Sequence, residues 1–362
     1  MKAEAPLLQV TDLTVERGRS FVLHIPSLVI GQGEILSLIG PNGCGKTTLL
    51  MALAGLLRPQ LGEIIFKGEP IHRSVNPLRY RRSIAMVFQE ALLLNTTVWD
   101  NVGMGLRFRG MAKSAMKDKV TENLERFRIT HLARRPARTL SGGEAQRTSL
   151  ARAFAVEPEV LFLDEPFSSL DAPSRESLME DLEAVLRRTR TTAVFATHDR
   201  IEAFRLSDRM AVMNAGRILQ IGPPDEVMNR PTDDFVAAFV GVENIAHGEV
   251  IAQEKETLVI SVSGKEIRAY GDVPAGEAVT ICLRPEWVTL SHVPEVHKTG
   301  AMNEFQARIE RIVFMGACAK VYLNVPFPRV AILSYHDMED QRLGIGRMVC
   351  GSFSVSSCHI IP

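Results

Sequence analysis

Residues able to hold a phosphate group are gathered in a glycine-rich segment near residue 40. The segment fits the pattern GxxxxGK[ST] and reads Gly40-Pro41-Asn42-Gly43-Cys44-Gly45-Lys46-Thr47, followed by Thr48. Small residues let backbone N–H groups surround phosphate oxygens at a helix N-terminus, where the helix dipole favours anions. Lys46 would reach the β- and γ-phosphates, and the Thr47 hydroxyl would ligate Mg²⁺. A glycine-rich turn with a chance Lys-Thr pair is the alternative, and the elements on either side favour nucleotide binding.

Two adjacent acids follow the apolar run 160–163. Asp164 at the end of a buried strand suits a residue that holds Mg²⁺ through water, and Glu165 suits a general base for an attacking water. Two solvated acids at a strand end are the alternative, which the phosphate-binding segment makes less favourable.

The segment Leu140-Ser141-Gly142-Gly143-Glu144-Ala145-Gln146-Arg147 combines a helix start with an exposed backbone. Ser141 and Glu144 form the pattern of a capping box, which predicts a helix beginning there. The two glycines leave the N–H groups of that helix end and the Ser141 hydroxyl open to an anion.

These motifs require a sheet with helices to position them. We expect strands at 34–39, 84–88, 160–163, 192–196 and 210–214, and helices at 46–57, 117–127, 144–155 and 174–188. Strands that alternate with helices predict a largely parallel sheet covered on both faces. Residues 92–138 lack strand signals and predict a helical insertion. After Pro231, short Val/Ile-rich runs predict an all-β domain, and a GEAV/GRMV similarity at 276–279 and 346–349 suggests two β repeats.

Composition limits the function. Balanced charges, 42 basic and 42 acidic, argue against nucleic acid as a partner. No apolar run approaches the roughly 18–20 residues that span a bilayer. The five cysteines form no CxxC pair, and no secretory leader is recognised, so we expect reduced thiols in the cytoplasm.

Taken together, the motifs between residues 7 and 240 resemble the ATP-binding subunit of ABC transporters. The resemblance implies an α/β P-loop NTPase fold over 1–240, with a helical subdomain at about 92–155. It also implies a head-to-tail homodimer that holds two ATP molecules with Mg²⁺. Each ATP would contact the glycine-rich segment of one copy and Ser141, Gly142 and Gly143 of the other.

The same resemblance assigns further residues. Gln89 matches the loop that senses Mg²⁺ and the γ-phosphate, and His198 matches the switch histidine at the γ-phosphate. Asp171 matches the loop at the dimer contact, and before Pro173 it also suits a helix N-cap. Family members stack adenine on an aromatic residue, whereas Arg17 occupies that position here. A guanidinium can stack on a base, and Phe21 is the alternative.

The task coupled to ATP hydrolysis follows from two regions. Residues 92–102 resemble the surface that docks a permease, with Trp99 as an interface anchor, although packing inside the helical subdomain explains them too. Residues 241–362 resemble the OB-like TOBE domain of importer ATPases, because residues 283–288 read LRPEWV. We therefore expect an importer subunit at the cytoplasmic face of the membrane, served by permease subunits and a solute-binding protein. A non-transport ABC ATPase is the less favoured alternative.

The TOBE-like region is most similar to that of molybdate and tungstate systems. There, a SARN-like turn and a Lys-containing strand help to bind the anion. The matching residues here are Gly300, Met302 and Ser354, so two cations are missing. Because such cations provide much of the attraction for a dianion, we hypothesise that regulatory oxyanion binding is weakened or lost. The solute is a candidate oxyanion, with sugar, iron, sulfate, polyamine and thiamine as alternatives.

Overall fold

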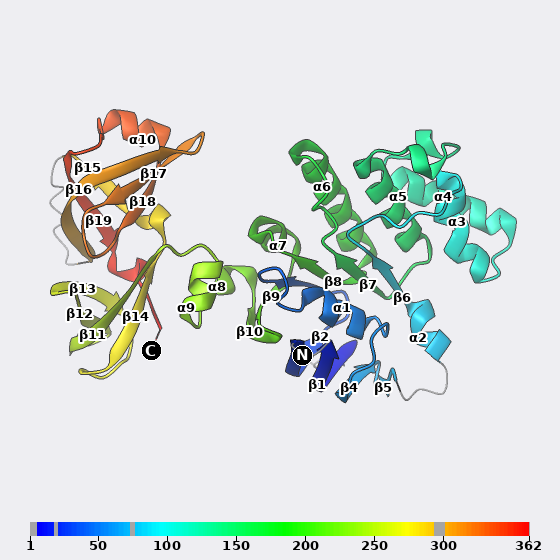
Figure 1. The fold of residues 1–362 in the computed structure, drawn as a ribbon, viewed down its shortest axis with the longest axis horizontal. Helices are drawn as coiled ribbons and strands as arrows, with labels where there is room; N and C mark the ends of the chain where they lie inside the picture. The colour runs from blue at the N-terminus through cyan, green and yellow to red at the C-terminus, as the bar shows by residue number, and fades with distance from the viewer. Residues whose placement is uncertain (1–5, 18–20, 73–76, 293–300, 362) are drawn as a thin grey trace. The chain divides into compact units, whose positions relative to one another are not determined.

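The computed structural model describes residues 6–17, 21–72, 77–292 and 301–361. The chain divides into two compact units, Met1–Pro224 and Asp225–Pro362, which are described separately here (Figure 1). This boundary lies before residue 240, the domain limit that the resemblance implies. The reason is that the short helices α8 (Pro224–Asn229) and α9 (Asp234–Phe239) associate with the β unit. Arg284 Nε donates a hydrogen bond to Asn229 Oδ1 at 3.0 Å, and α9 contacts β11.

The core of the first unit is a six-stranded sheet in the order β10-β9-β3-β8-β7-β6. All neighbouring pairs are parallel except β9 and β10. The five strands expected from the sequence occur within one residue of their predicted starts and ends. The six strands are β3 (Ile35–Ile39), β6 (Ile84–Val87), β7 (Val160–Asp164), β8 (Thr192–Thr197), β9 (Arg209–Asn214) and β10 (Arg217–Gly222).

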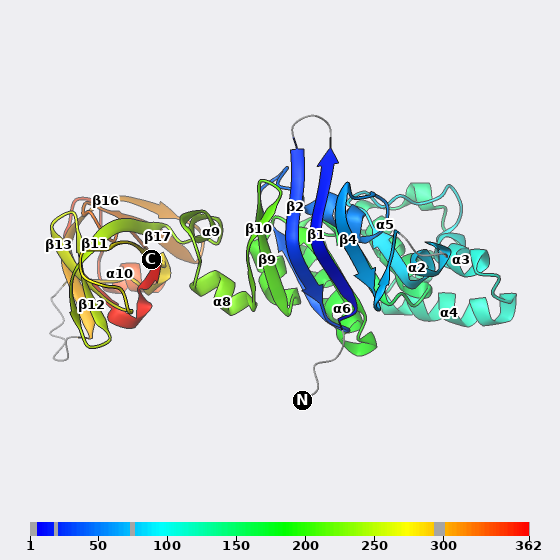
Figure 2. The same cartoon turned by 90° about the horizontal axis from the view of Figure 1, so that it is seen from below.

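A second, antiparallel sheet was not expected from the sequence. Its order is β2-β1-β4-β5, and Figure 2 shows β1, β2 and β4 side by side. The strands are β1 (Leu8–Arg17), β2 (Phe21–Ile30), β4 (Leu61–Phe66) and β5 (Glu69–Pro70). One hydrophobic cluster joins both sheets to helix α1, and it includes Leu8, Ile25, Leu38, Leu49 and Leu50. The second sheet therefore holds α1 and the loop before it.

Helices cover the parallel sheet and form the expected insertion. The helices are α1 (Lys46–Leu53), α2 (Pro77–Ser83), α3 (Val98–Phe108), α4 (Lys113–Arg126), α5 (Gly142–Ala155), α6 (Ala172–Thr189) and α7 (Arg200–Leu206). Helices α3, α4 and α5 contact one another and make up the helical subdomain. Helix α1 is shorter than predicted, because Gly55 takes a positive φ of 67° just beyond its end.

The second unit contains two five-stranded antiparallel sheets, ordered β13-β12-β11-β14-β20 and β15-β19-β16-β17-β18. The same order of elements occurs twice along the chain. Strands β11 (Asn244–Glu254), β12 (Thr257–Val262), β13 (Lys265–Tyr270), β14 (Ala278–Leu283) and β15 (Thr289–Ser291) come first. Strands β16 (Met302–Phe314), β17 (Cys318–Leu323), β18 (Val330–Ser334), β19 (Met348–Ser354) and β20 (His359–Ile361) follow, with α10 (Tyr335–Asp340) inserted.

The two halves of this unit exchange their last strands. Strand β20 pairs with β14 of the first half, and β15 pairs with β19 of the second half. A single hydrophobic core contains residues of both sheets, so the two halves share their buried apolar surface. Within the described residues, no helix of either unit is long and apolar enough to cross a membrane.

Candidate nucleotide site

The glycine-rich segment is a loop between β3 and α1, as the sequence predicts. Gly45 is the residue before the helix, with a φ of 112°, and Gly40 has a φ of 156°. A Cβ atom on Gly40 would lie 2.2 Å from the carbonyl oxygen of Met213, so only glycine fits there. Cys44 is buried in the loop, and burial raises the pKa of its thiol, which agrees with a small filler residue. The loop therefore leaves the N–H groups at the start of α1 open to an anion.

Lys46 is buried, and its ammonium group folds back over the loop. Its Nζ donates hydrogen bonds to the carbonyl oxygens of Gly40, at 2.8 Å, and Pro41, at 3.3 Å. It also lies 3.9 Å from Oε1 of Glu165. These partners satisfy the buried charge and hold it beside the helix end where a phosphate would bind.

The end of β7 brings Asp164 to the first turn of α1. The Thr47 hydroxyl donates a hydrogen bond to Asp164 Oδ1 at 2.8 Å. Burial raises the pKa of Asp164, and the bond from Thr47 partly opposes that shift. Glu165 follows with a positive φ of 48°, and its backbone N–H donates to the carbonyl of Ala196 on β8. The backbone is thereby turned so that Glu165 leaves the strand in a different direction from Asp164.

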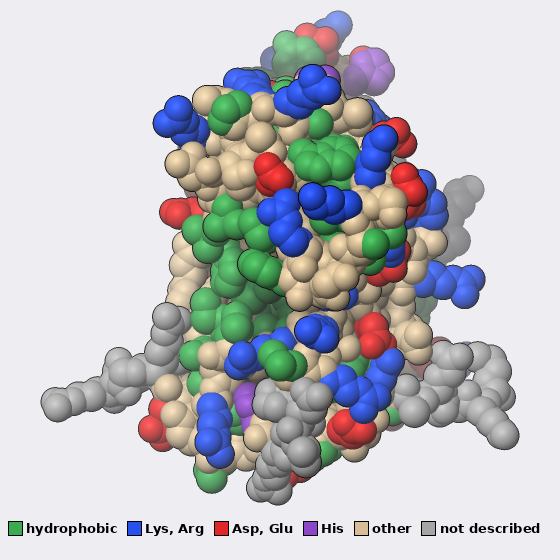
Figure 3. Space-filling model, turned by 90° about the vertical axis from the view of Figure 1, so that its right-hand side faces the viewer, with side chains coloured by type: hydrophobic (Ala, Val, Ile, Leu, Met, Phe, Trp, Pro, Cys, Tyr) green, Lys and Arg blue, Asp and Glu red, His purple; other side chains and the backbone are tan. Residues whose placement is uncertain are grey.

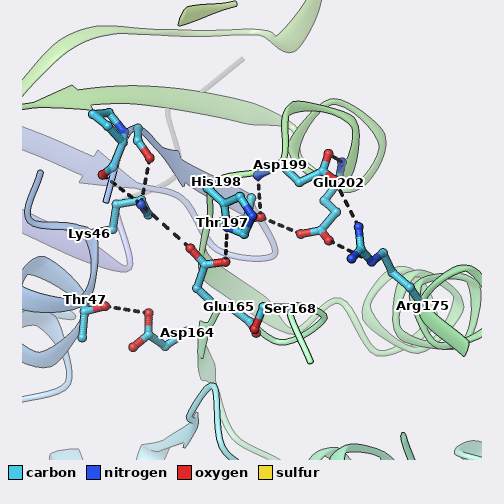
Figure 4. A network of polar contacts seen from close by, with 12 residues as sticks. Lys46, Thr47, Asp164, Glu165, Ser168, Arg175, Thr197, His198, Asp199 and Glu202 are labelled. Carbon is cyan, nitrogen blue, oxygen red and sulfur yellow. Dashed lines mark hydrogen bonds and ion pairs between the residues drawn. The ribbon is translucent and has the colours of Figure 1, made fainter. Parts of the chain in front are cut away.

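Glu165 also meets His198, which follows β8. The Nδ1 atom of His198 lies 2.7 Å from Glu165 Oε2, so the carboxylate faces Lys46 with one oxygen and His198 with the other (Figure 4). The Glu165 side chain is 13% exposed and that of His198 is 57% exposed. The residues predicted to act as general base and switch histidine thus lie at hydrogen-bond distance from each other beside the phosphate loop.

These side chains line one pocket of about 590 Å³, within the usual size of a ligand site. Its lining contains most of the residues predicted from the glycine-rich motif, together with Gln89 after β6. The lining residues are Asn42, Gly43, Gly45, Lys46, Thr47, Thr48, Gln89, Glu165 and His198. Four separate segments of the sequence therefore converge at the carboxyl edge of the parallel sheet or at the start of α1.

The Ser141 segment forms the expected capping box at the start of α5. Ser141 Oγ accepts a hydrogen bond from the Glu144 backbone, and Glu144 Oε2 accepts one from the Ser141 N–H at 2.8 Å. That backbone bond holds the pKa of Glu144 below its ordinary value. In the described part of the chain, Ser141, Gly142 and Gly143 do not line the pocket that contains Lys46.

Asp171 occupies the N-cap of α6. Its Oδ1 accepts a hydrogen bond from the Ser174 backbone N–H at 2.9 Å, and bonds from Ser174 lower the pKa of the carboxyl group. The helix-capping interpretation of Asp171 is therefore confirmed. Ser169 and Leu170, just before it, lie beside the two glycines at the start of α5.

The oxygen donors around Thr47 fit a magnesium ion. Thr47, Asp164 and the Gln89 amide supply hard oxygen atoms, the ligand type that Mg²⁺ prefers. Within the described residues there is no group of three or more His, Cys, Asp or Glu side chains that could hold a metal alone. This agrees with a cation that takes its remaining ligands from phosphate oxygens and water.

Two predicted sites fall outside what the structure describes. The side chains of Arg17 and Phe21 are not described, nor is Gly18 between them, so the adenine contact stays a prediction. Gly300 also lies outside the described residues. Sequence reasoning in turn missed Thr197, Glu202 and Arg175, which surround the backbone at His198. The pattern Asp199-x-x-Glu202, a helix-start signal, could have pointed to this region.

The fold and the site together define a P-loop ATPase with an added β domain. A family model described as ABC transporter matches residues 23–168, and one described as TOBE domain matches residues 281–361. The chain is 36% identical over 308 residues to the spermidine/putrescine import ATP-binding protein PotA of Thermotoga maritima. That alignment covers 84% of this chain and 83% of the relative.

Two further similar proteins support the same family. The molybdate/tungstate import ATP-binding protein WtpC of Pyrococcus horikoshii is 35% identical over 346 residues, covering 95% of this chain and 97% of the relative. The dimeric post-hydrolysis structure of the ATP-binding cassette MJ0796, bound to ADP and Pi, has a TM-score of 0.54 and 25% identity. It covers 60% of this chain and 98% of that chain. This chain belongs to the ABC transporter family, and it is an ATPase with a C-terminal TOBE domain. The predicted fold class is confirmed.

Proposed function

We propose that this chain is the ATP-hydrolysing subunit of an ABC importer and that it works as a homodimer. The observation that carries the proposal is the pocket that unites the phosphate loop with Glu165 and His198, with Asp164 hydrogen-bonded to Thr47 beside it. The TOBE domain and the two importer relatives support the direction of transport.

The geometry supports in-line hydrolysis of ATP. Glu165 accepts a proton from water while the water oxygen bonds to the γ-phosphorus, and the bond to the bridging oxygen of ADP breaks. Lys46, released from its carbonyl partners, and His198 stabilise charge on the γ-phosphate oxygens. Thr47, Asp164 and Gln89 would hold Mg²⁺, which would neutralise phosphate charge when bound.

A second copy completes each site. Among the described residues, Ser141, Gly142 and Gly143 do not line the pocket of their own chain. In a head-to-tail homodimer they contact the ATP held by the partner, with Asp171 at the dimer contact. The dimeric state of the cassette MJ0796 supports this arrangement.

The segment before α3 is the docking surface for the permease subunits. Leu92 and Leu94 are 58% and 46% exposed, and Trp99 is half-buried nearby. On the side of this unit that carries α3 and α4, hydrophobic side chains form a band among Lys and Arg side chains (Figure 3). Docking there places the chain at the cytoplasmic face of the membrane, bound to protein rather than to lipid.

The solute is an oxyanion or a polyamine. Met302 and Ser354 are direct partners in the register of β16 and β19, so the two positions expected to carry cations do come together. Neither side chain is charged, which supports the loss of a regulatory oxyanion site in this domain. The two relatives, with names that specify polyamine and oxyanion import, are nearly equal in identity and leave both solutes open.

Copurification with the native permease tests the proposal, followed by ATP hydrolysis in proteoliposomes. We expect hydrolysis to rise when the solute-binding protein carries its solute, with tungstate, molybdate, spermidine and putrescine screened in turn. The Lys46→Ala subunit is the control, and it should abolish ATP binding and stimulation. An absence of any permease partner, with hydrolysis unaffected by all solutes, would contradict the importer assignment.

A further inference from the structure

A second set of polar contacts lies behind His198 and fixes the backbone on both of its sides (Figure 4). The Thr197 hydroxyl donates a hydrogen bond to Glu202 Oε2 at 2.6 Å and accepts one from the Asp199 backbone N–H at 3.0 Å. One hydroxyl therefore links the residue before His198 to the residue after it. Because its proton is committed to Glu202, its lone pair faces Asp199.

Glu202 is an unusual partner for the Thr197 hydroxyl. The hydroxyl needs only one acceptor, and here that acceptor is a buried carboxylate. The residue is 4% exposed on α7, and burial raises its pKa. A buried carboxylate is unfavourable unless it is paired and hydrogen-bonded. Its other oxygen, Oε1, lies 3.9 Å from Nε of Arg175.

Arg175 extends the contacts to another helix. It belongs to α6, and its Nη1 lies 3.4 Å from Asp199 Oδ2, within hydrogen-bond distance. Asp199 in turn caps α7 by accepting a hydrogen bond from the Ile201 backbone N–H at 2.8 Å. Helix α6 begins at Ala172 after its N-cap Asp171, which immediately follows the residues beside Gly142 and Gly143. A continuous series of polar contacts thus joins the first turn of α6 to the backbone on both sides of His198.

Holding the two helices together does not by itself require these residues. Arg205 on α7 also forms ion pairs with Glu176 and Glu183 on α6, at the exposed side of the same helix pair. Asp199 already caps α7 through its own side chain. The buried Glu202 and the Thr197 hydroxyl are therefore in excess of what helix packing needs.

We infer that Thr197, Glu202 and Arg175 are positioning residues for ATP hydrolysis: they hold His198 in place against Glu165 and make its orientation depend on α6. The inference rests on the proposed function, because His198 is assigned there to the γ-phosphate. It adds a link within one chain between the helix that follows the dimer-contact loop and the switch histidine.

The test compares Thr197→Val with Thr197→Ser in the full chain. Valine keeps the shape and removes the hydroxyl, whereas serine keeps the hydroxyl. A misplaced group near the reacting atoms can lower turnover by about 10- to 100-fold. We expect such a loss of kcat for Thr197→Val, whose ATP affinity should be unchanged. Thr197→Ser should keep near-normal turnover.

Arg175→Gln is the second variant, because its side chain is partly exposed and the fold should tolerate its loss. We expect a smaller loss of kcat for it.

A double-mutant cycle with His198→Ala separates positioning from stability. If Thr197 acts through His198, Thr197→Val lowers turnover no further once His198 is removed. Arg205→Gln is the matched control, because it breaks an α6–α7 ion pair that does not touch Thr197, and it should leave kcat unchanged. Additive losses in the cycle, or equal turnover of the Val and Ser variants, would overturn the inference. Failure of His198→Ala itself to lower turnover would instead contradict the proposed function.

Discussion

The two units of this chain place their expected ligand groups in different ways. In the ATPase unit the expected phosphate contacts come from consecutive residues, Gly40 to Thr47, and depend on the shape of their backbone. In the β unit the expected anion contacts come from side chains on separate strands, Met302 on β16 and Ser354 on β19. In both units the expected positions lie close together. Only the ATPase unit, however, has the residue types that the expected ligand contacts require.

The comparison shows which kind of site survives substitution. A backbone cradle needs glycines and a helix start, so its function can be recognised from a short motif. A site made by side chains keeps its geometry when the charged residues are replaced, because the strand pairing does not depend on them. The fold of the β unit alone therefore cannot establish a ligand.

The largest effect is expected in the ATPase unit. Glu165→Gln should retain ATP binding, because the glycine loop and Lys46 are unchanged. Turnover should fall by about 10²- to 10⁴-fold, the usual contribution of a general base. Steady-state phosphate release and equilibrium ATP binding measure the two quantities. Normal hydrolysis by this variant would remove Glu165 from its assigned role.

A smaller gain is expected when cations are returned to the β unit. The double variant Met302→Arg with Ser354→Lys places two charges on directly paired residues. A hydrogen bond to a charged group contributes about 1.5–3 kcal/mol, so tungstate affinity should rise at least about 10-fold. Calorimetry on the full chain measures it.

The matched control for that gain is Met302→Gln with Ser354→Gln, which adds similar length without charge. It should bind tungstate no better than the unmodified chain. Tight tungstate binding by the unmodified chain would show that the β unit holds an oxyanion without these cations, and the contrast between the units would fail.

The smallest effect concerns stability and pH. Burial raises the pKa of Glu202 above its ordinary 4.5, the Thr197 bond and Arg175 oppose the shift, and Asp199 and Glu165 add to it. The folded chain therefore binds this proton more readily than the unfolded chain. The stability that this group contributes is present at low pH and is lost as pH rises through the raised pKa.

The Glu202→Gln variant has no group that ionises at this position. The difference between its free energy of unfolding and that of the unmodified chain should therefore grow in favour of the variant between about pH 4 and pH 7. Denaturant unfolding at several pH values measures the difference. A difference that shrinks towards neutral pH would contradict the burial argument.

Much of the ATPase unit could be predicted, since its strands are continuous apolar runs and its loops carry fixed spacings. The run 160–164 and the loop before Lys46 illustrate this, because strand, turn and helix signals agree locally. The antiparallel strands β1 and β2 were missed, although their buried and exposed residues alternate along much of their length. The pairing of β1 with β4 joins segments about 50 residues apart, which local patterns do not reveal.

The contacts around His198 were missed for a related reason. Arg175 meets Asp199 across 24 residues, and the meeting depends on how α6 packs against α7. The position of the boundary at Pro224 likewise depends on which unit α8 and α9 contact. Such tertiary choices are decided by packing, whereas the capping boxes and N-caps at Ser141 and Asp171 are decided by neighbouring residues.

The central claim is that one ATP site is built from two copies of the chain, and mixing two inactive variants tests it directly. Lys46→Ala disables the phosphate loop. Gly142→Asp places a negative charge where the partner's phosphate would bind. A Cβ atom at Gly142 meets only ordinary contact, 3.7 Å from the Ser169 carbonyl, and an acid is favourable at a helix start, so the fold should persist.

Neither variant should hydrolyse ATP alone, and the mixture should regain activity because one site of the mixed dimer has both halves intact. Differently tagged copies show by pull-down that mixed dimers form. Persistent inactivity of verified mixed dimers, or full activity of Gly142→Asp alone, would contradict the two-copy site.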